Sequence, residues 1–426
     1  MHQALTVIAR IKPERAADLE ATLDRIGGDI GGKRENDIIK LGDIETLQFG
    51  RWVMIPNQAT GRMEHLLFTS NFDGPLRAHL NEFVEKYGAA MDAIWGCCEG
   101  YPQGREENPT QFKKQFRNFI RAHSYNYNAF YTGYHNERVA DKRAYVRLHE
   151  AMDDFFDLPP VRAVAEERLK GMHNRTPIED LQAFNDIPEA RQFYDNRIQR
   201  VLCDLPLTHN MPPKPNLKVV MRFVFDFIWM TAWMLVIRPL RNRITGREPA
   251  LNLNLDDLSV HEGVTEIEDV VTQNQITVIS RVKPGLWVWL KLNIVLIAIH
   301  LVGRYFNNQG ALGGIATIHF ARWAIIDQGR WLLFTSNYDG SWDSYIGDFV
   351  DKAASGMDLI WTSAPRYPQK GSRDIEAFKA IIRVNQVKTQ AFYSAFPDRT
   401  IVNLINDGQM ANGIYRDRSA EWLRRV

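Results

Sequence analysis

Apolar and polar residues alternate in short runs near the start of the chain, and the same runs return in its second half. Residues 5–13 (LTVIARIKP) alternate with the two-residue period of a strand, and Pro13 then suits the first turn of a helix. Residues 276–284 (ITVISRVKP) repeat both features. Further on, LLFTSNFDG at 66–74 returns as LLFTSNYDG at 332–340. Half of the positions in 66–95 and 332–361 are identical, which indicates an internal duplication.

The order of elements is the same in both copies. In the first copy the pattern predicts a strand, a helix and a hairpin whose strands include Trp52 and end at Thr69. A helix from Asp73 to Trp95, a later helix and an aromatic strand around Phe130 follow. This βαββαβ order is that of the ferredoxin-like unit. Two such units can bury their open sheet faces against each other, so we expect an α+β fold in which two repeats pair as a pseudo-twofold α+β barrel.

The repeats also define the expected domains. Residues 4–157 form the first ferredoxin-like repeat, 158–274 an inter-repeat helical segment, and 275–420 the second repeat. A length of 426 residues agrees with more than one hydrophobic core. Whether the chain assembles further is left open.

Two inserted helices are apolar nearly all round. The first helix of repeat 1 is amphipathic, but its counterpart at 286–307 is not, and a second apolar helix at 219–237 precedes Arg238, Arg241 and Arg243. Neither helix cleanly provides the about 20 apolar residues that cross a bilayer. Aromatic residues with arginines at a helix end favour a monotopic or peripheral helix in the headgroup region. The alternatives are internal packing of the two helices and a two-helix span. The residues expected to face lipid are Phe223, Trp229, Trp233, Leu286, Trp287 and Trp289.

Charge and cysteine content exclude several classes of protein. The 52 basic and 51 acidic side chains nearly cancel, so the chain lacks the basic excess typical of nucleic-acid binding. Three cysteines, two of them adjacent, cannot form a disulfide framework or a four-cysteine zinc site. The first residues show no apolar secretory signal. We therefore expect the cytoplasmic face of a membrane, with the lipid surface as partner.

A histidine in one copy only is the main candidate for chemistry. His319 lies in the second strand of repeat 2, where repeat 1 has Gln48, as expected of a single asymmetric site in a duplicated scaffold. Strict alternation along this strand predicts that His319 and Arg322 face opposite sides of the sheet. A structural histidine is the alternative.

Polar residues at the end of the third strand form a second candidate group. Asn337 and Asp339 belong to SNYDG, and repeat 1 has SNFDG at the same place. The aspartates could instead cap the following helix, and the asparagines could close the turn. Arg281, at the end of the first strand of repeat 2, could reach into a barrel cavity or lie exposed. Late in repeat 1, several tyrosines including Tyr134 favour a polar aromatic surface.

With both repeats in this topology, the chain resembles the dimeric α+β barrel superfamily, which includes dye-decolorising peroxidases, chlorite dismutases, aldoxime dehydratases and cofactor-free monooxygenases. Dye-decolorising peroxidases carry a GxxDG motif whose aspartate works beside haem, and this chain has serine in place of the first glycine. The resemblance implies haem as cofactor, with His319 as the iron ligand. It further implies that Arg322 or Arg281 acts with Asp339 on peroxide.

These observations predict a membrane-associated oxidoreductase, haem-dependent and peroxidase-like, that acts on a lipophilic small molecule entering from the bilayer. One alternative is a non-catalytic protein that binds a lipid or another small molecule in the barrel. The other is a cofactor-free oxygenase or isomerase of the same superfamily. Haem absorbance of the purified protein would separate the first prediction from the other two.

Overall fold

The structure is a computed structural model of the whole chain. It describes residues 2–27, 38–57, 59–134, 137–169, 175–206, 216–237, 239–240, 251, 253, 255, 271–306 and 310–415. Contacts group the chain into two compact units. Unit 1 comprises Met1–His135 and Pro212–Arg399, and unit 2 comprises Asn136–Met211 and Thr400–Val426. Because this grouping follows contacts and not sequence similarity, the repeat boundaries remain predictions.

Unit 1 contains the strands and most of the helices of both repeats, and the predicted α+β class is confirmed. Residues 139–156 and 401–413, which lie inside the predicted repeats, belong to unit 2. The first set is β1 (His2–Arg10), α1 (Ala16–Gly27), β2 (Leu47–Asn57), β3 (Arg62–Asp73), α2 (Leu76–Trp95), α3 (Pro109–Ala122) and β4 (Ala129–Thr132). The second set is β5 (Gln273–Arg281), α11 (Leu286–Tyr305), β6 (Ile318–Ile326), β7 (Trp331–Asp339), α12 (Trp342–Trp361), α13 (Ile375–Val384) and β8 (Ala391–Ser394). Both sets follow the predicted ferredoxin-like order.

The strands form two four-stranded antiparallel sheets that exchange their last strands. One sheet has the order β1-β3-β2-β8 and the other β4-β6-β7-β5. Each short fourth strand therefore completes the sheet of the other repeat: Phe49 of β2 pairs with Ser394 of β8, and Phe130 of β4 pairs with Arg322 of β6. Neither sheet is complete within one repeat.

The segments leading into the exchanged strands also bond to the first strand of their own repeat. Ile8 N–H donates to His123 O at 3.0 Å, and Tyr125 N–H donates to Thr6 O at 2.9 Å. Residues 385 and 387 make the same two bonds to β5, each at 2.9 Å. The chain thus passes from one sheet to the other at both edges, with backbone hydrogen bonds on either side of the crossing.

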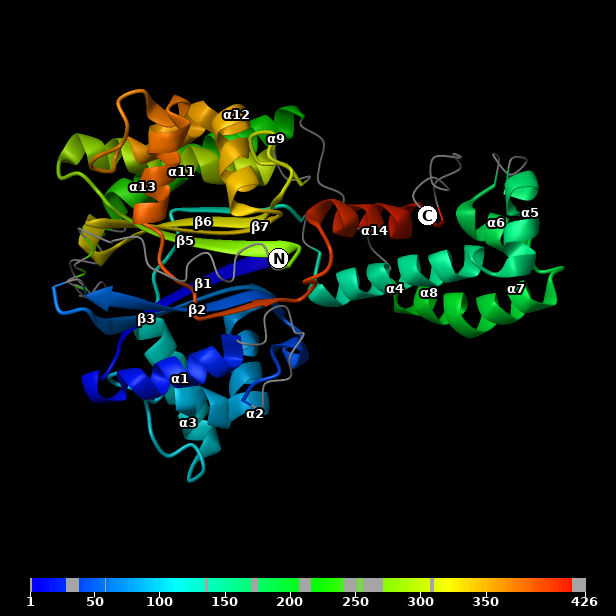
Figure 1. Cartoon of the computed structure of the whole chain (residues 1–426), viewed down its shortest axis with the longest axis horizontal. Helices are drawn as coiled ribbons and strands as arrows, with labels where there is room; N and C mark the ends of the chain where they lie inside the picture. Colours follow the sequence, from blue (N-terminus) through cyan, green and yellow to red (C-terminus); the bar gives the residue numbers. More distant parts are fainter. Residues whose placement is uncertain are drawn as a thin grey trace. The chain divides into compact units, whose positions relative to one another are not determined.

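Helices cover the outer face of each sheet, and the inner faces lie toward each other (Figure 1). One apolar cluster joins β1–β3 to α1, α2 and α3, and a second joins β5–β7 to α11, α12 and α13. A third cluster contains side chains of both sheets, among them Ile8, Val53, Ile279 and Leu333. The alternation of the strands supplies one face to each layer.

Two buried arginines connect the inner faces. Arg51 of β2 donates to Ile276 O at 2.6 Å and Ser336 O at 2.8 Å in the other sheet. Arg322 of β6 reciprocates, donating to Leu5 O at 2.5 Å and Ser70 O at 3.1 Å. Burial lowers the pKa of both guanidinium groups to about 9, so both stay charged at neutral pH.

The two apolar helices lie on the outer side of the β5–β7 sheet. The inner face of α11 packs on that sheet through Leu292 and Leu296. Helix α9 (Leu217–Ala232), which continues as a π-helical turn over Trp233–Ile237, packs on α11 through Phe223 and Phe227. Both helices are long and apolar enough to cross a membrane, a test that a buried core helix also passes.

Unit 2 is helical in its described residues. It contains α4 (Val139–Phe156), α5 (Pro159–Leu169), α6 (Pro177–Gln182), α7 (Pro188–Phe193), α8 (Gln199–Asp204) and α14 (Ile401–Gly413). Helices α4 and α14 pack on each other and are joined by His149 Nδ1 and Asp407 Oδ1 at 2.5 Å. The described helices share an apolar cluster that includes Leu148, Phe155 and Met410.

Removing one inter-sheet guanidinium should destabilise the protein strongly. Arg322→Met would remove the guanidinium bonds to the buried carbonyls of Leu5 and Ser70, at a cost of about 3 kcal/mol in the free energy of unfolding. Arg51→Met should cost a similar amount because its contacts are the mirror set. Chemical denaturation monitored by circular dichroism measures both. Wild-type stability in either variant would show that the guanidinium bridge is dispensable.

Buried His79 predicts an acid-dependent loss of stability. It stacks on Phe72 at 4.0 Å between ring centroids and bonds to Thr46 Oγ1 at 2.7 Å and Ser70 Oγ at 3.1 Å. Burial lowers its pKa from 6.5 to about 3, against the smaller opposing effect of Asp73. Below pH 6.5 the unfolded chain therefore binds a proton that the folded chain does not, and stability falls. By about pH 5 the loss relative to neutral pH should be about 2 kcal/mol.

The second repeat supplies the matched control for this pH dependence. Tyr345 replaces His79 there, stacks on Tyr338 and donates to Ser336 Oγ at 2.6 Å. His79→Tyr should therefore keep the packing and remove the extra loss of stability in acid. Burial also lowers the pKa of His65. Because His65 is present in both wild type and variant, its contribution to the pH dependence cancels. If the free energy of unfolding fell equally with pH in wild type and variant, the assignment to His79 would be contradicted.

Candidate functional site

A β-bulge places His319 on the inner side of its sheet. The register of β6 with β7 shifts between Ile318 and Phe320, so alternation is interrupted at His319. Both His319 and Phe320 then contact Phe49 of the facing sheet, with ring centroids 5.4 and 5.5 Å apart. The prediction that His319 and Arg322 face opposite sides was wrong, because it assumed an unbroken two-residue period.

His319 is the centre of a buried hydrogen-bonded group. Its Nε2 lies 2.6 Å from Asp339 Oδ1, and its Nδ1 bonds to the hydroxyl of Tyr134. A neutral imidazole that donates from Nε2 to the carboxylate can accept the Tyr134 hydroxyl at Nδ1. The exposed fraction of His319 is 0% and that of Tyr134 is 1%. Tyr134 was predicted to lie on a polar surface, and its role beside His319 was not anticipated.

Repeat 1 holds the equivalent aspartate by other means. The Gln48 side-chain amide donates to both oxygens of Asp73 at 3.1 Å, and His2 Nδ1 lies 3.0 Å from Asp73 Oδ1. In each copy a buried carboxyl group at the end of the third strand is thus bonded to a side chain from the bulge. Both arrangements provide hydrogen-bond donors to a buried carboxylate, which is strongly destabilising without them. This common pattern favours a structural role for His319.

The alternative that the aspartates and asparagines form caps and turns was also wrong. The third strands continue to Asp73 and Asp339 and do not end at Thr69 or its counterpart. Ser341 caps α12, and the residue before α2 is Pro75, which makes no side-chain cap bond. Asn71 and Asn337 meet between the sheets, where the Asn71 amide donates to Asn337 Oδ1 at 3.2 Å.

The arginine candidates occupy two different places. Arg322 lies between the sheets, where it also bonds to Thr6 Oγ1 at 2.8 Å and to Asn71. Arg281 is exposed at the end of β5 and lines a cavity there, and its counterpart Arg10 is exposed as well. The structure therefore brings together His319 with Asp339, and Arg322 with Asn71 and Asn337, but it leaves Arg281 outside both groups.

The residues around His319 do not fit a haem. An iron ligand needs a free ring lone pair, and both ring nitrogens of His319 are bonded to protein groups. Within the described part of the chain, no group of three or more His, Cys, Asp or Glu side chains could hold a metal ion. The haem prediction thus rests on the family resemblance alone.

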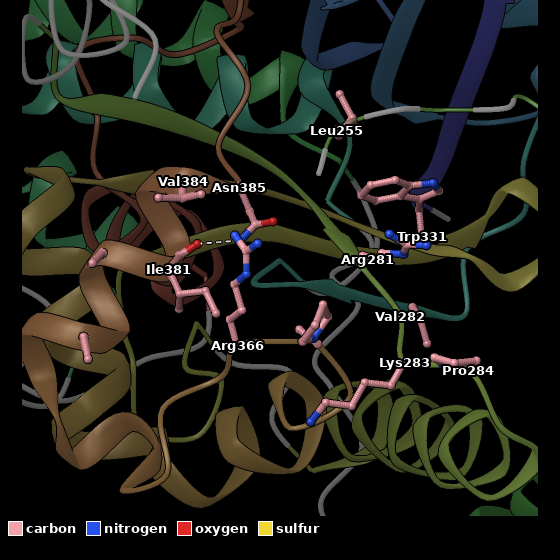
Figure 2. A pocket seen from close by; sticks show the side chains of 14 residues that line it. Leu255, Arg281, Val282, Lys283, Pro284, Trp331, Arg366, Ile381, Val384 and Asn385 are labelled. Carbon is pink, nitrogen blue, oxygen red and sulfur yellow. Dashed lines mark hydrogen bonds between the residues drawn. The ribbon is translucent and has the colours of Figure 1, made fainter. Parts of the chain in front are cut away.

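A cavity lies beside Arg281. It has a volume of about 730 Å³ and lies between the end of β5, the connection after α12 and helix α13 (Figure 2). This volume is within the range of ligand pockets. Arg366, which also lines it, was not among the predicted residues. Its signal in the sequence was indirect, since repeat 1 has Gly100 at the same distance from the shared tryptophan.

The comparison of the repeats predicts that glutamine can replace His319. His319→Gln should change the free energy of unfolding by about 1 kcal/mol or less, because Gln48 already holds Asp73 in this way. His319→Leu should cost about 3 kcal/mol, since the buried Asp339 carboxylate loses the donor that His319 provides. Denaturant unfolding of the two variants gives both values. Equal losses in both would show that the imidazole has a role that glutamine cannot fill.

Comparison with known proteins adds no assignment. No family model, no curated protein and no solved structure matches this chain. The exposed face of α9 and the cavity beside Arg281 are the features of this structure that bear most directly on function.

Proposed function

We propose that this protein attaches to a membrane surface and binds a lipid or another lipophilic small molecule without a cofactor-dependent reaction. The observation that carries this proposal is the outward face of α9. Its exposed large apolar residues recur at helical spacing: Leu217, Val220, Met221, Val224, Phe225, Ile228 and Trp229, with Val236 in the turn that follows. A contiguous apolar stripe of this size marks an interaction surface.

Packing of α9 on α11 leaves this face exposed. The opposite face of α9 contacts α11, and Tyr305 of α11 donates to Asp226 of α9 at 2.5 Å. Of the most apolar stretch of α9, only 6% is buried, compared with 33% for α11. Internal packing, the alternative explanation of these helices, accounts for the inner face alone. Transfer of the outer face into lipid would contribute on the order of 5–10 kcal/mol.

Charge on α9 is suited to an anionic lipid surface. Lys218 and Arg222 are exposed, and Arg222 Nε lies 3.3 Å from Oδ1 of Asp226, the acidic residue among the described residues of α9, which is buried. The chain continues with Arg238, Arg241 and Arg243. Basic residues beside an apolar helix are attracted to the anionic cytoplasmic leaflet. These features support the cytoplasmic face of a membrane as the location.

Surface attachment is favoured over a span. Leu292 and Leu296 of α11 pack on the β5–β7 sheet, so one side of this helix is covered by protein along much of its length. Its first turn is open, with Leu286 67% and Trp287 82% exposed, while Trp289 and Trp233 are partly buried. The sheet thus covers one face of this helix pair. Such a pair can lie in the headgroup region with its helices parallel to the membrane plane.

We also propose that the two sheets constitute a pseudo-twofold α+β barrel. The exchanged strands β4 and β8, the backbone bonds at both edges and the reciprocal contacts of Arg51 and Arg322 support this pairing. The inner space near His319 is filled by aromatic rings, including Phe49, Phe130 and Phe320. A ligand site at the end of the barrel, outside this packed interior, fits these contacts better than one at its centre.

The outward face of α9 predicts binding to vesicles. Wild-type protein should float with vesicles of phosphatidylcholine and phosphatidylglycerol, and Phe225→Glu combined with Trp229→Glu should lower the partition coefficient about tenfold or more. Leu359→Glu is the matched control, because Leu359 is also exposed but lies on α12. Failure of the wild type to float, or equal flotation of all three proteins, would contradict the proposal.

A further inference from the structure

Four basic side chains gather on the outer surface of α2 and α3 in repeat 1. Arg77 lies in the first turn of α2, and Lys114, Arg117 and Arg121 lie on one side of α3. Arg117 Nη1 donates to Asn81 Oδ1 of α2 at 2.7 Å, and Asn81 is one turn after Arg77. This bond holds the basic residues of the two helices at one surface. We call these four basic residues the basic patch.

Repeat 2 carries no net charge at the same four positions. The matching runs AFYT and AFYS, at 129–132 and 391–394, align α3 with α13, and the ungapped match of 66–95 to 332–361 aligns α2 with α12. The residues equivalent to Arg77, Lys114, Arg117 and Arg121 are, in this order, Asp343, Glu376, Lys379 and Arg383. Two acidic and two basic residues thus stand where repeat 1 has four basic ones.

An ion pair in repeat 2 shows that two of these positions are neighbours. Lys379 Nζ lies 2.9 Å from Asp343 Oδ1. The same two positions in repeat 1 hold Arg117 and Arg77, which repel each other. Desolvation, and after it the charges of Arg77 and Arg121, lower the pKa of Arg117. Repeat 1 therefore holds like charges together where repeat 2 has a favourable pair.

The place of Arg77 on its helix is also unfavourable. The N-terminal end of a helix carries the positive end of the macrodipole, which favours acidic side chains. The first turn of α12 accordingly contains Asp343, whereas the first turn of α2 contains no acidic residue. Glu85, one turn beyond Asn81, is already bonded to Lys113 Nζ at 2.6 Å. An acidic residue at position 77 would thus stabilise the helix and remove the repulsion.

Structural contacts explain two members of the basic patch. Arg121 lies in the last turn of α3, where it complements the negative end of the helix dipole, and Arg383 does the same in α13. Arg117 bonds to Asn81. Arg77 and Lys114 are exposed, and neither forms a side-chain hydrogen bond or an ion pair within the described part of the chain. The difference between the two copies lies in these two residues.

The basic patch faces away from the helices that we assign to lipid. Helices α2 and α3 pack on the outer face of the β1–β3 sheet, whereas α9 and α11 lie outside the β5–β7 sheet (Figure 1). A membrane that receives α9 would therefore lie on the other side of unit 1. Nucleic acid is disfavoured by the near balance of 52 basic and 51 acidic side chains in the chain.

We propose that the basic patch is a docking surface for an acidic segment of a partner protein. The guanidinium groups of Arg77, Arg117 and Arg121 receive carboxylates of the partner, and Lys114 extends the positive surface along α3. Bound carboxylates would offset the repulsion in the patch, as Asp343 does within repeat 2. The inference goes beyond lipid binding, and only the choice of a protein over an anionic lipid rests on the proposed attachment through α9.

Fluorescence anisotropy with a labelled decaglutamate peptide at low ionic strength tests the inference, and decaglutamine is the uncharged control. The full chain should bind decaglutamate and not decaglutamine. Arg77→Asp should weaken this binding about tenfold or more, because it removes one cation of the patch and neutralises a second. The melting temperature of this variant should rise, since the new carboxylate can pair with Arg117 as Asp343 pairs with Lys379.

A matched variant separates the basic patch from the net charge of the chain. Arg62→Asp makes the same change of charge at an exposed arginine in the same repeat, but Arg62 begins β3 whereas Arg77 follows the end of that strand. This variant should keep wild-type affinity. Equal weakening by the two variants, wild-type affinity of Arg77→Asp, a lower melting temperature of Arg77→Asp, or no binding of decaglutamate by the wild type would each overturn the basic patch.

Two further probes distinguish other polyanions from an acidic protein. If a ten-nucleotide oligothymidylate bound through Arg77 more tightly than decaglutamate, nucleic acid would replace protein as the partner. If Arg77→Asp lowered flotation with vesicles of phosphatidylcholine and phosphatidylglycerol, lipid would replace it. If the wild type does not float but binds decaglutamate through Arg77, attachment through α9 fails and the basic patch stands. If it floats but does not bind decaglutamate, attachment stands and the basic patch fails.

Discussion

The reciprocal contact of two buried guanidinium groups with the backbone of the opposite sheet is the interaction on which unit 1 depends. Arg51 of β2 and Arg322 of β6 each extend from one sheet to carbonyl oxygens of the other. A buried cation needs several acceptors to offset its desolvation, and carbonyls at fixed positions in a sheet provide them in one relative placement only. Apolar packing alone would allow the sheets to slide, whereas these bonds, together with the backbone bonds at both edges, fix the placement of one sheet on the other.

Around these reciprocal arginines the two repeats have diverged, both in the core and at the surface. Tyr345 bonds to Ser336 where His79 bonds to Ser70 in repeat 1. Arg366 replaces Gly100, and the apolar α11 replaces the amphipathic α1. The first two replacements keep the local backbone, whereas α11 is also longer than α1, with 20 residues against 12. The change from α1 to α11 occurs in one repeat only, which is why we place the lipid surface on that repeat and not at the shared centre.

The sequence predicted the fold better than the site, for identifiable reasons. The duplicated runs gave the strands, their order and the apolar helices, because these depend on local periodicity. The bulge at His319 interrupts that periodicity without a local signal, so the face of this residue was predicted wrongly. The partnership of Tyr134 with His319 joins elements far apart in the chain, which no local pattern reveals. Arg366 could have been noticed by aligning the repeats, since glycine opposite arginine indicates a left-handed position.

The exchange of the last strand has an implication for how such a chain arose. A single repeat would lack the fourth strand of its sheet, so an ancestral one-copy protein with this topology would have needed a second molecule to supply it. In that symmetric dimer every mutation would have appeared twice. In a fused chain each position is independent, so one half can have Gly100 with neighbouring glutamates where the other has Arg366. Covalent linkage thereby allows the two halves of a symmetric architecture to differ.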